Sequence, residues 1–258
     1  VCAFACGIVI YFVTDDAPKG NYTELKKNGL MQPVSAAASF RSGALNLNTW
    51  IMFIHYGCCF GVELTMNNAA ALYFKDKFGQ STESAAALAS IFGWMNIFAR
   101  GLGGYLSDKF NARMGMRGRI LIHTYMLLAE GGLVLLFAHT NTLGGAIAVM
   151  IVFGIHCDAA CGTSYGIVPY VDPASTGAVS GIVGAGGNCG AVGFGLAFRN
   201  RGWKQAFTIM GATILGSTIL SCFIFIKGCS SLLFGGEDTI GQKAVALEVP
   251  GPETFTKG

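Results

Sequence analysis

Long apolar runs separated by short polar stretches dominate this chain. A helix needs about 20 mostly apolar residues to cross a lipid bilayer, and six runs are long enough. They cover residues 47–74, 84–106, 120–138, 144–171, 174–198 and 203–226. The pattern therefore predicts an all-α membrane protein with six spanning helices.

A seventh apolar run opens the chain but covers only residues 1–13. At a rise of about 1.5 Å per residue it would span ~20 Å, which is less than the ~30 Å hydrocarbon core of a bilayer. A signal peptide would need a basic segment and a small-residue cleavage site, and neither is present. We therefore expect the C-terminal part of a spanning helix that is cut short at Val1.

Basic residues gather in the polar connector at residues 107–119, where Lys109, Arg113, Arg117 and Arg119 stand against Asp108. Lys and Arg are enriched in cytoplasmic loops, so this connector is predicted to be cytoplasmic. The order of the spans places two further segments on the same side: the polar connector at residues 14–46 and the tail at residues 227–258. The bases within residues 199–204 then fall on the opposite side. We expect the tail to be mobile.

The composition supports a protein dissolved in lipid. Of 258 residues, 52% are hydrophobic and 12% are charged, whereas a soluble domain carries about 25% charged residues. The mean hydropathy is +0.53. These values exclude a disordered chain, a coiled coil and most soluble enzymes. A net charge of +3 without a basic run gives no indication of nucleic-acid binding.

The nine cysteines are an odd number and lie mostly inside apolar runs, where cysteine behaves as a small hydrophobe. The segment 156–161 resembles a metal cluster in composition, but no second pair of ligands lies nearby. The sequence therefore gives no evidence of a disulfide framework, and we expect neither a metal site nor a cofactor.

Ionisable residues inside the predicted spans are the first candidates for function, because they are costly in lipid. The set comprises Glu63, Arg100, Glu130, Asp158, His55 and His156. Glu130 could pair with another helix or line a polar cleft, and Asp158 could satisfy a neighbouring helix. These structural roles stay open beside a functional one.

Arg100 is the sharpest of these candidates. Arginine keeps its charge in a protein, so it needs a carboxylate partner or a bound anion. Its planar fork suits a flat oxyanion, and Asn96 lies one turn earlier on the same face as a further donor. Snorkelling of the side chain to the cytoplasmic interface is an equally good interpretation of Arg100 at this point.

Glycines and other small residues recur every four positions along residues 177–197. Such spacing lets helices, or a ligand, approach the backbone closely. Packing alone explains the glycines but not Asn188, which stands among Gly184, Gly186, Gly187 and Gly190.

Charged residues at the end of the second predicted span suggest a latch. Asp108 lies at that end, and Arg113, Arg117 or Arg119 can reach it. A charge pair there could hold the cytoplasmic ends of two helices together and open during rocking. A solvated loop with unpaired bases is the alternative.

Several motifs resemble a known family. Residues 103–109 (GGYLSDK) resemble the cytoplasmic loop motif of the major facilitator superfamily, in its second half. Residues 184–191 (GAGGNCGA) resemble the glycine-rich nitrate signature of its nitrate/nitrite porter family. Further motifs at residues 56–64, 96–100, 115–119 and 166–170 are similar to the eukaryotic high-affinity branch. The resemblance runs from residue 1 to about residue 226.

The resemblance implies one part of a twelve-helix transporter made of two six-helix halves. Residues 1–13 would be the end of helix six and residues 14–46 the central cytoplasmic loop. Residues 47–226 would be the C-terminal six-helix bundle, and residues 227–258 a cytoplasmic tail. The N-terminal six-helix half would be missing.

The resemblance also implies a binding site. The family holds nitrate between two arginines, one per half, and Arg100 matches the arginine of helix eight. Asn96 and the aromatic Tyr56 and Phe60 would lie near the anion, together with Gly184, Gly186, Gly187, Asn188 and Gly190. Glu63 is a candidate for the proton-linked group, with a structural role as the alternative. Asp158, Asp172 and Cys189 depart from the family's motifs.

The implied activity is transport of nitrate or nitrite by alternating access, coupled to protons as a symporter and not as an enzyme. A nitrate/nitrite exchanger, a superfamily transporter of another anion or sugar, and a non-transporting sensor are the alternatives. The implied partners are nitrate, nitrite, protons, the lipid bilayer, the missing half and an accessory membrane subunit. The plasma membrane is the expected location.

Overall fold

The computed structural model describes residues 2–14, 27 and 35–233. The chain divides into two units, with the boundary in the sequence between Ser39 and Phe40. The first unit contains helix α1 (Cys2–Val13), whose described residues are all exposed. Helix α3 (Ala36–Leu45) lies within the connector predicted at residues 14–46, where no helix was expected. Its sequence, AAASFRSGAL, has only ten residues and consists mostly of small side chains, so it gives no apolar run of spanning length.

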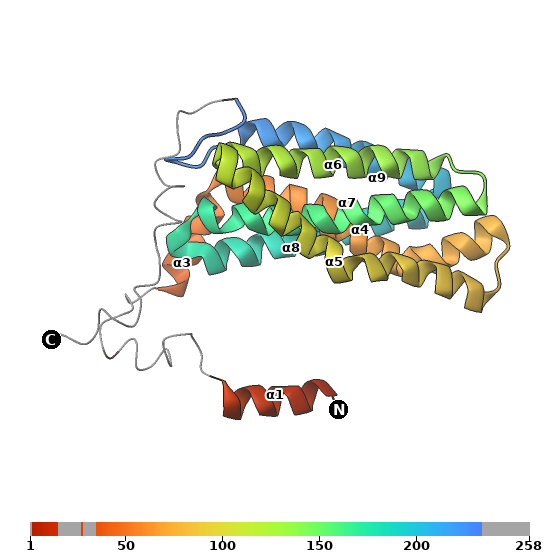
Figure 1. The fold of residues 1–258 in the computed structure, drawn as a ribbon, viewed down its shortest axis with the longest axis horizontal. Coiled ribbons are helices and arrows are strands. Elements are labelled where there is room, and N and C mark those ends of the chain that lie inside the picture. The colour runs from red at the N-terminus through yellow and green to blue at the C-terminus, as the bar shows by residue number, and fades with distance from the viewer. Residues whose placement is uncertain (1, 15–26, 28–34, 234–258) are drawn as a thin grey trace. The chain divides into compact units, whose positions relative to one another are not determined.

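Residues 47–233 form a bundle of six long helices, which run along a common direction (Figure 1). Their bounds are α4 (Leu47–Phe78), α5 (Thr82–Met114), α6 (Met116–Ala138), α7 (Leu143–Val171), α8 (Thr176–Asn200) and α9 (Trp203–Ser217). Short 3-10 turns precede α8 (η1, Pro173–Ser175) and follow α9 (η2, Thr218–Phe223). The all-α fold predicted from the apolar runs is therefore confirmed.

Side chains and glycines at the helix ends explain where several helices begin and stop. The side chains of Asn46, Ser81 and Thr142 accept hydrogen bonds from free backbone N–H groups at the starts of α4, α5 and α7. Gly79 ends α4 with φ of 64°, a conformation that favours glycine.

The prediction of a polar loop at residues 107–119 is wrong. Helix α5 continues to Met114, and α6 begins at Met116, so the connection is the single residue Gly115 with φ of 62°. The basic residues of this segment are therefore fixed on two helices. Glycine allows so tight a reversal because its positive φ is free of the Cβ penalty.

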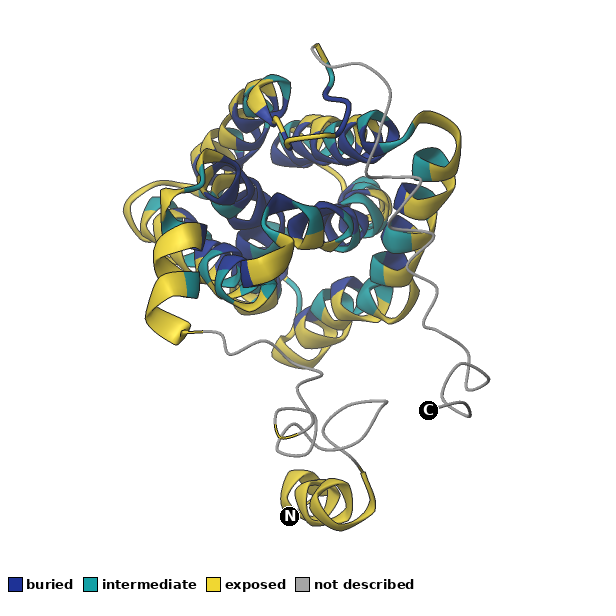
Figure 2. Ribbon diagram, turned by 90° about the vertical axis from the view of Figure 1, so that its left-hand side faces the viewer, coloured by how far each residue is buried: buried dark blue, intermediate teal, exposed yellow. Residues whose placement is uncertain are grey.

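Five stretches of the described chain are long and apolar enough to span a membrane: α5, α6, α7, α8 with η1, and α9 with η2. Helix α4, the first of the six predicted spans, is not among them. It has 32 residues but carries polar side chains such as Asn48, His55 and Glu63, which are buried. Its neighbours shelter these groups, and Figure 2 shows buried residues on the inner faces of the bundle. A helix shielded by protein needs less apolar surface than one facing lipid.

Glycines bring α4 and α8 into direct backbone contact. A Cβ at Gly190 would overlap the Gly57 carbonyl oxygen, and one at Gly61 would lie 2.9 Å from the Gly190 backbone. A Cβ at Gly186 would likewise overlap the Phe53 carbonyl oxygen. The small-residue pattern of residues 177–197 therefore serves helix packing on this face of α8.

A chain of buried hydrogen bonds links four helices. His55 Nε2 lies 2.9 Å from the Ser217 carbonyl oxygen, and His55 Nδ1 lies 3.2 Å from His123 Nε2. His123 Nδ1 lies 2.8 Å from Thr163 Oγ1. The three side chains are fully buried, so their polar atoms depend on one another for hydrogen bonds.

The segment after η2 packs against the bundle, so the expectation of a mobile tail is wrong for residues 227–233. The Arg117 backbone N–H donates to Ser230 Oγ at 3.1 Å, and Arg117 Nε donates to the Ser231 carbonyl oxygen at 2.8 Å. Cys229, Ser230 and Ser231 are buried. The rest of the predicted tail, residues 234–258, lies outside the described residues.

Candidate functional site

Arg100 lies in an ion pair inside the bundle. Its Nη2 atom is 2.6 Å from Oε2 of Glu63, which projects from α4. Asn96, one turn earlier on α5, donates Nδ2 to Oε1 of the same carboxylate at 2.6 Å. Arg100 therefore reaches a carboxylate partner instead of snorkelling to the interface. The need of Arg100 for a partner was predicted from the sequence, whereas Asn96 was expected to donate to the anion and instead donates to Glu63.

Aromatic rings form a wall beside this pair. The Phe60 ring centroid lies 5.6 Å from Arg100 Cζ, which is a cation–π distance. Tyr56 stacks on Phe60 with 5.2 Å between centroids, and Tyr165 of α7 meets Tyr56 edge-on at 5.2 Å. Tyr165 was not singled out from the sequence, because a tyrosine in an apolar run gives no signal of its own. The side chain of Arg100 remains 35% exposed on the open side of this wall.

The residues of the glycine signature have two kinds of neighbour: the backbone of α4 and the aromatic side chains of this wall. Gly186 and Gly190 pack against the α4 backbone, as described above, whereas a Cβ at Gly187 would overlap the Phe60 ring. Gly184 faces the Tyr165 hydroxyl, 3.6 Å from the position of a Cβ. Asn188, one turn after Gly184, is exposed. That all these residues surround an anion, as expected from the sequence, stays a prediction. Of the five, Gly184 and Gly187 lie next to the aromatic wall.

The arrangement combines a guanidinium, a group that binds oxyanions, with a carboxylate that pairs with it. The Arg100 guanidinium offers a planar fork of donors, and Phe60 covers it with a flat apolar face. Glu63 now occupies part of the fork. An anion that binds Arg100 must therefore compete with Glu63 or share the guanidinium with it.

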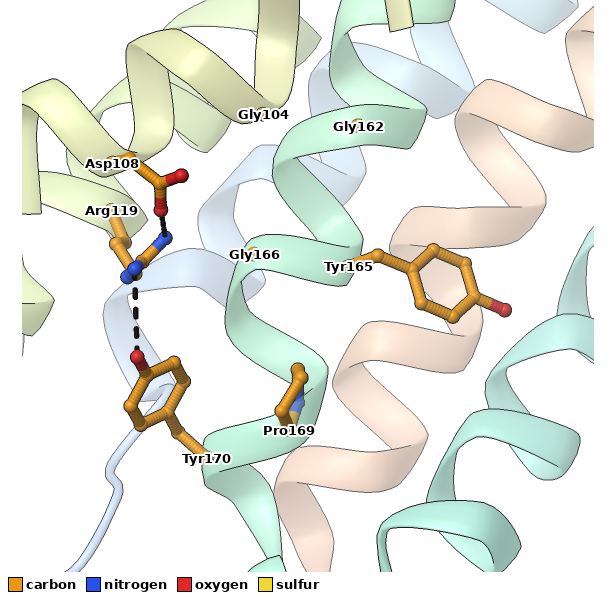
Figure 3. A pocket seen from close by; sticks show the side chains of 8 residues that line it. All are labelled: Gly104, Asp108, Arg119, Gly162, Tyr165, Gly166, Pro169 and Tyr170. Atoms are coloured by element: carbon orange, nitrogen blue, oxygen red, sulfur yellow. Dashed lines mark hydrogen bonds and ion pairs between the residues drawn. The ribbon is translucent and has the colours of Figure 1, made fainter. Parts of the chain in front are cut away.

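A second cluster lies where α5, α6 and α7 meet, at the predicted latch (Figure 3). Arg119 Nη1 is 2.8 Å from Asp108 Oδ1 and donates to Ser107 Oγ at 3.1 Å. Arg119 Nη2 donates to the Tyr170 hydroxyl at 3.5 Å. Asp108, Arg119 and Tyr170 line a pocket together with Gly104, Gly162, Tyr165, Gly166 and Pro169.

The three predicted partners of Asp108 have different positions. Arg119 is the base that pairs with Asp108, and the pair joins α5 to α6. Arg117 instead binds the segment after η2 through Ser230 and Ser231. Arg113 lies exposed in the last turn of α5. The role of the pair as a conformational latch stays a prediction.

The two partners of this pair should differ in their effect on stability. Asp108→Asn should lower the free energy of unfolding by no more than about 1 kcal/mol, because the Asp108 side chain is 71% exposed. Arg119→Ala should lower the free energy of unfolding by about 1–3 kcal/mol. It removes the group that donates a hydrogen bond to the buried Ser107 hydroxyl, and it removes the packing of the guanidinium on the Tyr170 ring. Thermal unfolding in detergent measures both. Equal losses for the two variants would contradict this assignment.

Comparison with known proteins supports a transporter. Residues 1–195 match the Major Facilitator Superfamily. The chain is 35% identical over 223 residues to "High affinity nitrate transporter 2.5" of Arabidopsis thaliana, covering 85% of this chain and 44% of that protein. It is 38% identical over 232 residues to "Nitrate transporter 2.1" of Chlamydomonas reinhardtii, covering 85% and 42%. It is 36% identical over 233 residues to "High-affinity nitrate transporter 2.3" of Oryza sativa subsp. japonica, covering 88% and 45%.

The chain spans less than half the length of these three relatives. Their names describe transporters and not enzymes, which agrees with a bundle that contains five helices apolar and long enough to span a membrane among its described residues. The match over most of the chain and the all-α architecture lead to the same conclusion: the chain belongs to the Major Facilitator Superfamily.

Proposed function

We propose that this chain forms one six-helix half of a transporter that carries nitrate across a membrane. The observation that carries the proposal is Arg100, held inside the bundle by Glu63 and covered by Phe60, in a chain similar to named nitrate transporters. Nitrate is a planar anion whose oxygens match the fork of a guanidinium. A flat ring beside the guanidinium suits a flat anion equally well.

Proton coupling is the second element of the proposal. Nitrate and the Glu63 carboxylate compete for the same guanidinium, so protonation near Glu63 would favour the anion. This competition supports symport in which Glu63 is linked to the proton through its pairing with Arg100. Nitrite is proposed as a further substrate. Exchange of nitrate for nitrite needs no proton and is the rival mechanism.

A second six-helix half is the partner that the proposal requires. Only 17% of the apolar stretch of α5 and 28% of that of α8 are buried, against 50% in α6. Gly93 and Gly101 of α5, and Gly181 and Gly193 of α8, have open space around them within the described residues. Such glycines permit close approach of other helices. The missing half would cover these faces, supply a second cation and allow alternating access about a central site.

The test is transport by the full-length protein in liposomes. An inward proton gradient should drive nitrate accumulation, and nitrite should compete while chloride and sugars should not. Plasma-membrane location and the need for an accessory subunit can be assessed by expressing the tagged protein with and without that subunit. Nitrate uptake that is independent of the proton gradient but requires nitrite inside the liposomes would favour the exchanger. Absence of nitrate movement in every arrangement would overturn the proposed function.

A further inference from the structure

Asp158 is a fully buried carboxyl group near the middle of α7. Among the described residues, neither of its oxygens has a hydrogen-bond donor. An ionised carboxylate in such a position lacks both water and a partner, which is among the costliest arrangements in a protein interior. Asp158 therefore needs an explanation that packing does not provide.

The helix packing brings Asp158 to the Arg100 site. A Cβ at Gly162 would overlap the Arg100 carbonyl oxygen, so α7 touches α5 at this level. Cys161, in the next turn after Asp158, has its Sγ 3.9 Å from Glu63 Oε2. The Asp158 carboxyl group is therefore near enough to Glu63 and Arg100 for its charge to interact with theirs. Two carboxylates only accept hydrogen bonds, so they can bond to each other only when one carries a proton.

The charges around Asp158 come from four helices. Helix α4 provides Glu63 and Cys59, α5 provides Arg100, and α6 provides the buried Glu130. Helix α7 itself adds the thiols of Cys157 and Cys161. Over its described length, α8 has Cys189 and Arg199 as titratable side chains, and both are exposed. Arg100 thus interacts with two of these carboxyl groups, those of Glu63 and Asp158, and Glu63 already pairs with it.

We propose that Asp158 is the site of the coupling proton and that the Glu63 carboxylate accepts the hydrogen bond of its protonated form. This inference rests on the proposed nitrate transport and names the group that binds the proton. In this proton-loaded form, the Asp158 hydroxyl would donate to the Glu63 carboxylate in a charge-assisted bond.

Charge explains how this proton would be coupled to the anion. With Asp158 protonated, Arg100 and Glu63 leave the three-residue cluster neutral, and an incoming nitrate meets the guanidinium without a net opposing charge. Loss of the proton gives the cluster a charge of −1, which repels nitrate. Proton and nitrate therefore bind cooperatively, and by linkage each raises the affinity for the other. One proton enters from the side on which the site is open and leaves with nitrate on the other side.

Asp158→Asn separates coupling from binding in the full-length protein. The amide still donates to Glu63 but cannot release a proton. Nitrate-for-nitrate exchange between vesicles and medium at equal pH should persist, because the site is fixed in its neutral form. Proton-driven accumulation of nitrate, and the pH change that accompanies it, should fall about tenfold or more, since an amide does not titrate at these pH values. Asp158→Glu should restore part of both.

Asp172→Asn is the matched control, because Asp172 caps the C-terminal end of the same helix and its carboxylate accepts a hydrogen bond from Ser42, away from the Arg100 site. It should keep exchange and accumulation alike. If Asp158→Asn accumulates nitrate against the gradient as well as the native protein, the inference is overturned while nitrate transport stands. If the native protein exchanges no nitrate, the proposed function fails and the inference fails with it.

A measurement on the native protein covers the case in which the variants do not fold. Nitrate added to the purified protein in weakly buffered detergent solution should remove protons from the medium, and nitrate affinity should weaken as the pH rises. Chloride added in the same way should take up no protons. Nitrate binding with no proton uptake and no pH dependence would overturn the role of Asp158.

Discussion

Replacing Arg100 by alanine in the full-length protein should reduce nitrate uptake by at least about 100-fold, because two hydrogen bonds from a charged donor are each worth about 1.5–3 kcal/mol. Arg100 is the cation that this bundle contributes to the proposed site, and Phe60 holds its guanidinium from one side. Arg100→Lys should also impair uptake, because an ammonium is a point charge without the planar fork. Uptake of labelled nitrate into cells or liposomes measures both variants.

Loss of Arg100 also leaves Glu63 buried without its cation, so misfolding has to be separated from loss of binding. The double variant Arg100→Ala/Glu63→Gln removes both charges and should restore the amount of folded protein without restoring uptake. Arg201→Ala is the matched control, because Arg201 is exposed between α8 and α9. Normal uptake by a folded Arg100→Ala variant would exclude Arg100 from the binding site.

Gly190→Val should be among the most destabilising single substitutions in the bundle. A Cβ at Gly190 would overlap the Gly57 carbonyl oxygen and lie 2.7 Å from the Gly57 Cα atom, so α8 would have to move away from α4. Overpacking of this kind costs roughly 3 kcal/mol when backbone opposes backbone, and we expect a loss of that order in the free energy of unfolding. Thermal unfolding in detergent and the yield of folded protein report the effect.

Gly132→Ala is the comparison for this variant. Within the described residues, nothing lies within 4 Å of a Cβ at Gly132, which is exposed in the middle of α6. Alanine should be neutral or should stabilise the helix by up to about 1 kcal/mol, which is the difference in helix propensity. A Gly190→Val variant as stable as Gly132→Ala would show that the α4–α8 contact is looser than described.

The sequence predicted the helices well because their signal is local. Apolar runs of more than 18 residues give the spans of α5 to α9 directly, whatever their neighbours are. The turn at Gly115 was missed because a basic, polar stretch of sequence is equally compatible with a loop and with the exposed ends of two helices. The packed segment at residues 227–233 was missed because the hydrogen bonds that hold it against the bundle come from Arg117, 113 and 114 positions earlier in the chain.

Most residues of the site were predicted from the sequence, but the contacts between them were not. Arg100 requires a partner on physical grounds, but that the partner is Glu63, 37 positions away, depends on how α4 and α5 pack. The glycine signature looked uniform along the chain. Only the packing of α4 separates Gly186 and Gly190, which touch its backbone, from Gly187, which touches the Phe60 ring.

The chain of buried hydrogen bonds through His55 and His123 has one direction of donation. The Ser217 carbonyl oxygen can only accept, so His55 Nε2 carries a hydrogen, and the neutral ring must accept at Nδ1. His123 then carries its hydrogen on Nε2 and accepts at Nδ1 from the Thr163 hydroxyl. That hydroxyl also lies 3.0 Å from the Ala160 carbonyl oxygen, and its single hydrogen serves one acceptor at a time. A carbonyl on α9 thus makes His123 Nδ1 an acceptor for a hydroxyl on α7, through two rings that hold one tautomer each.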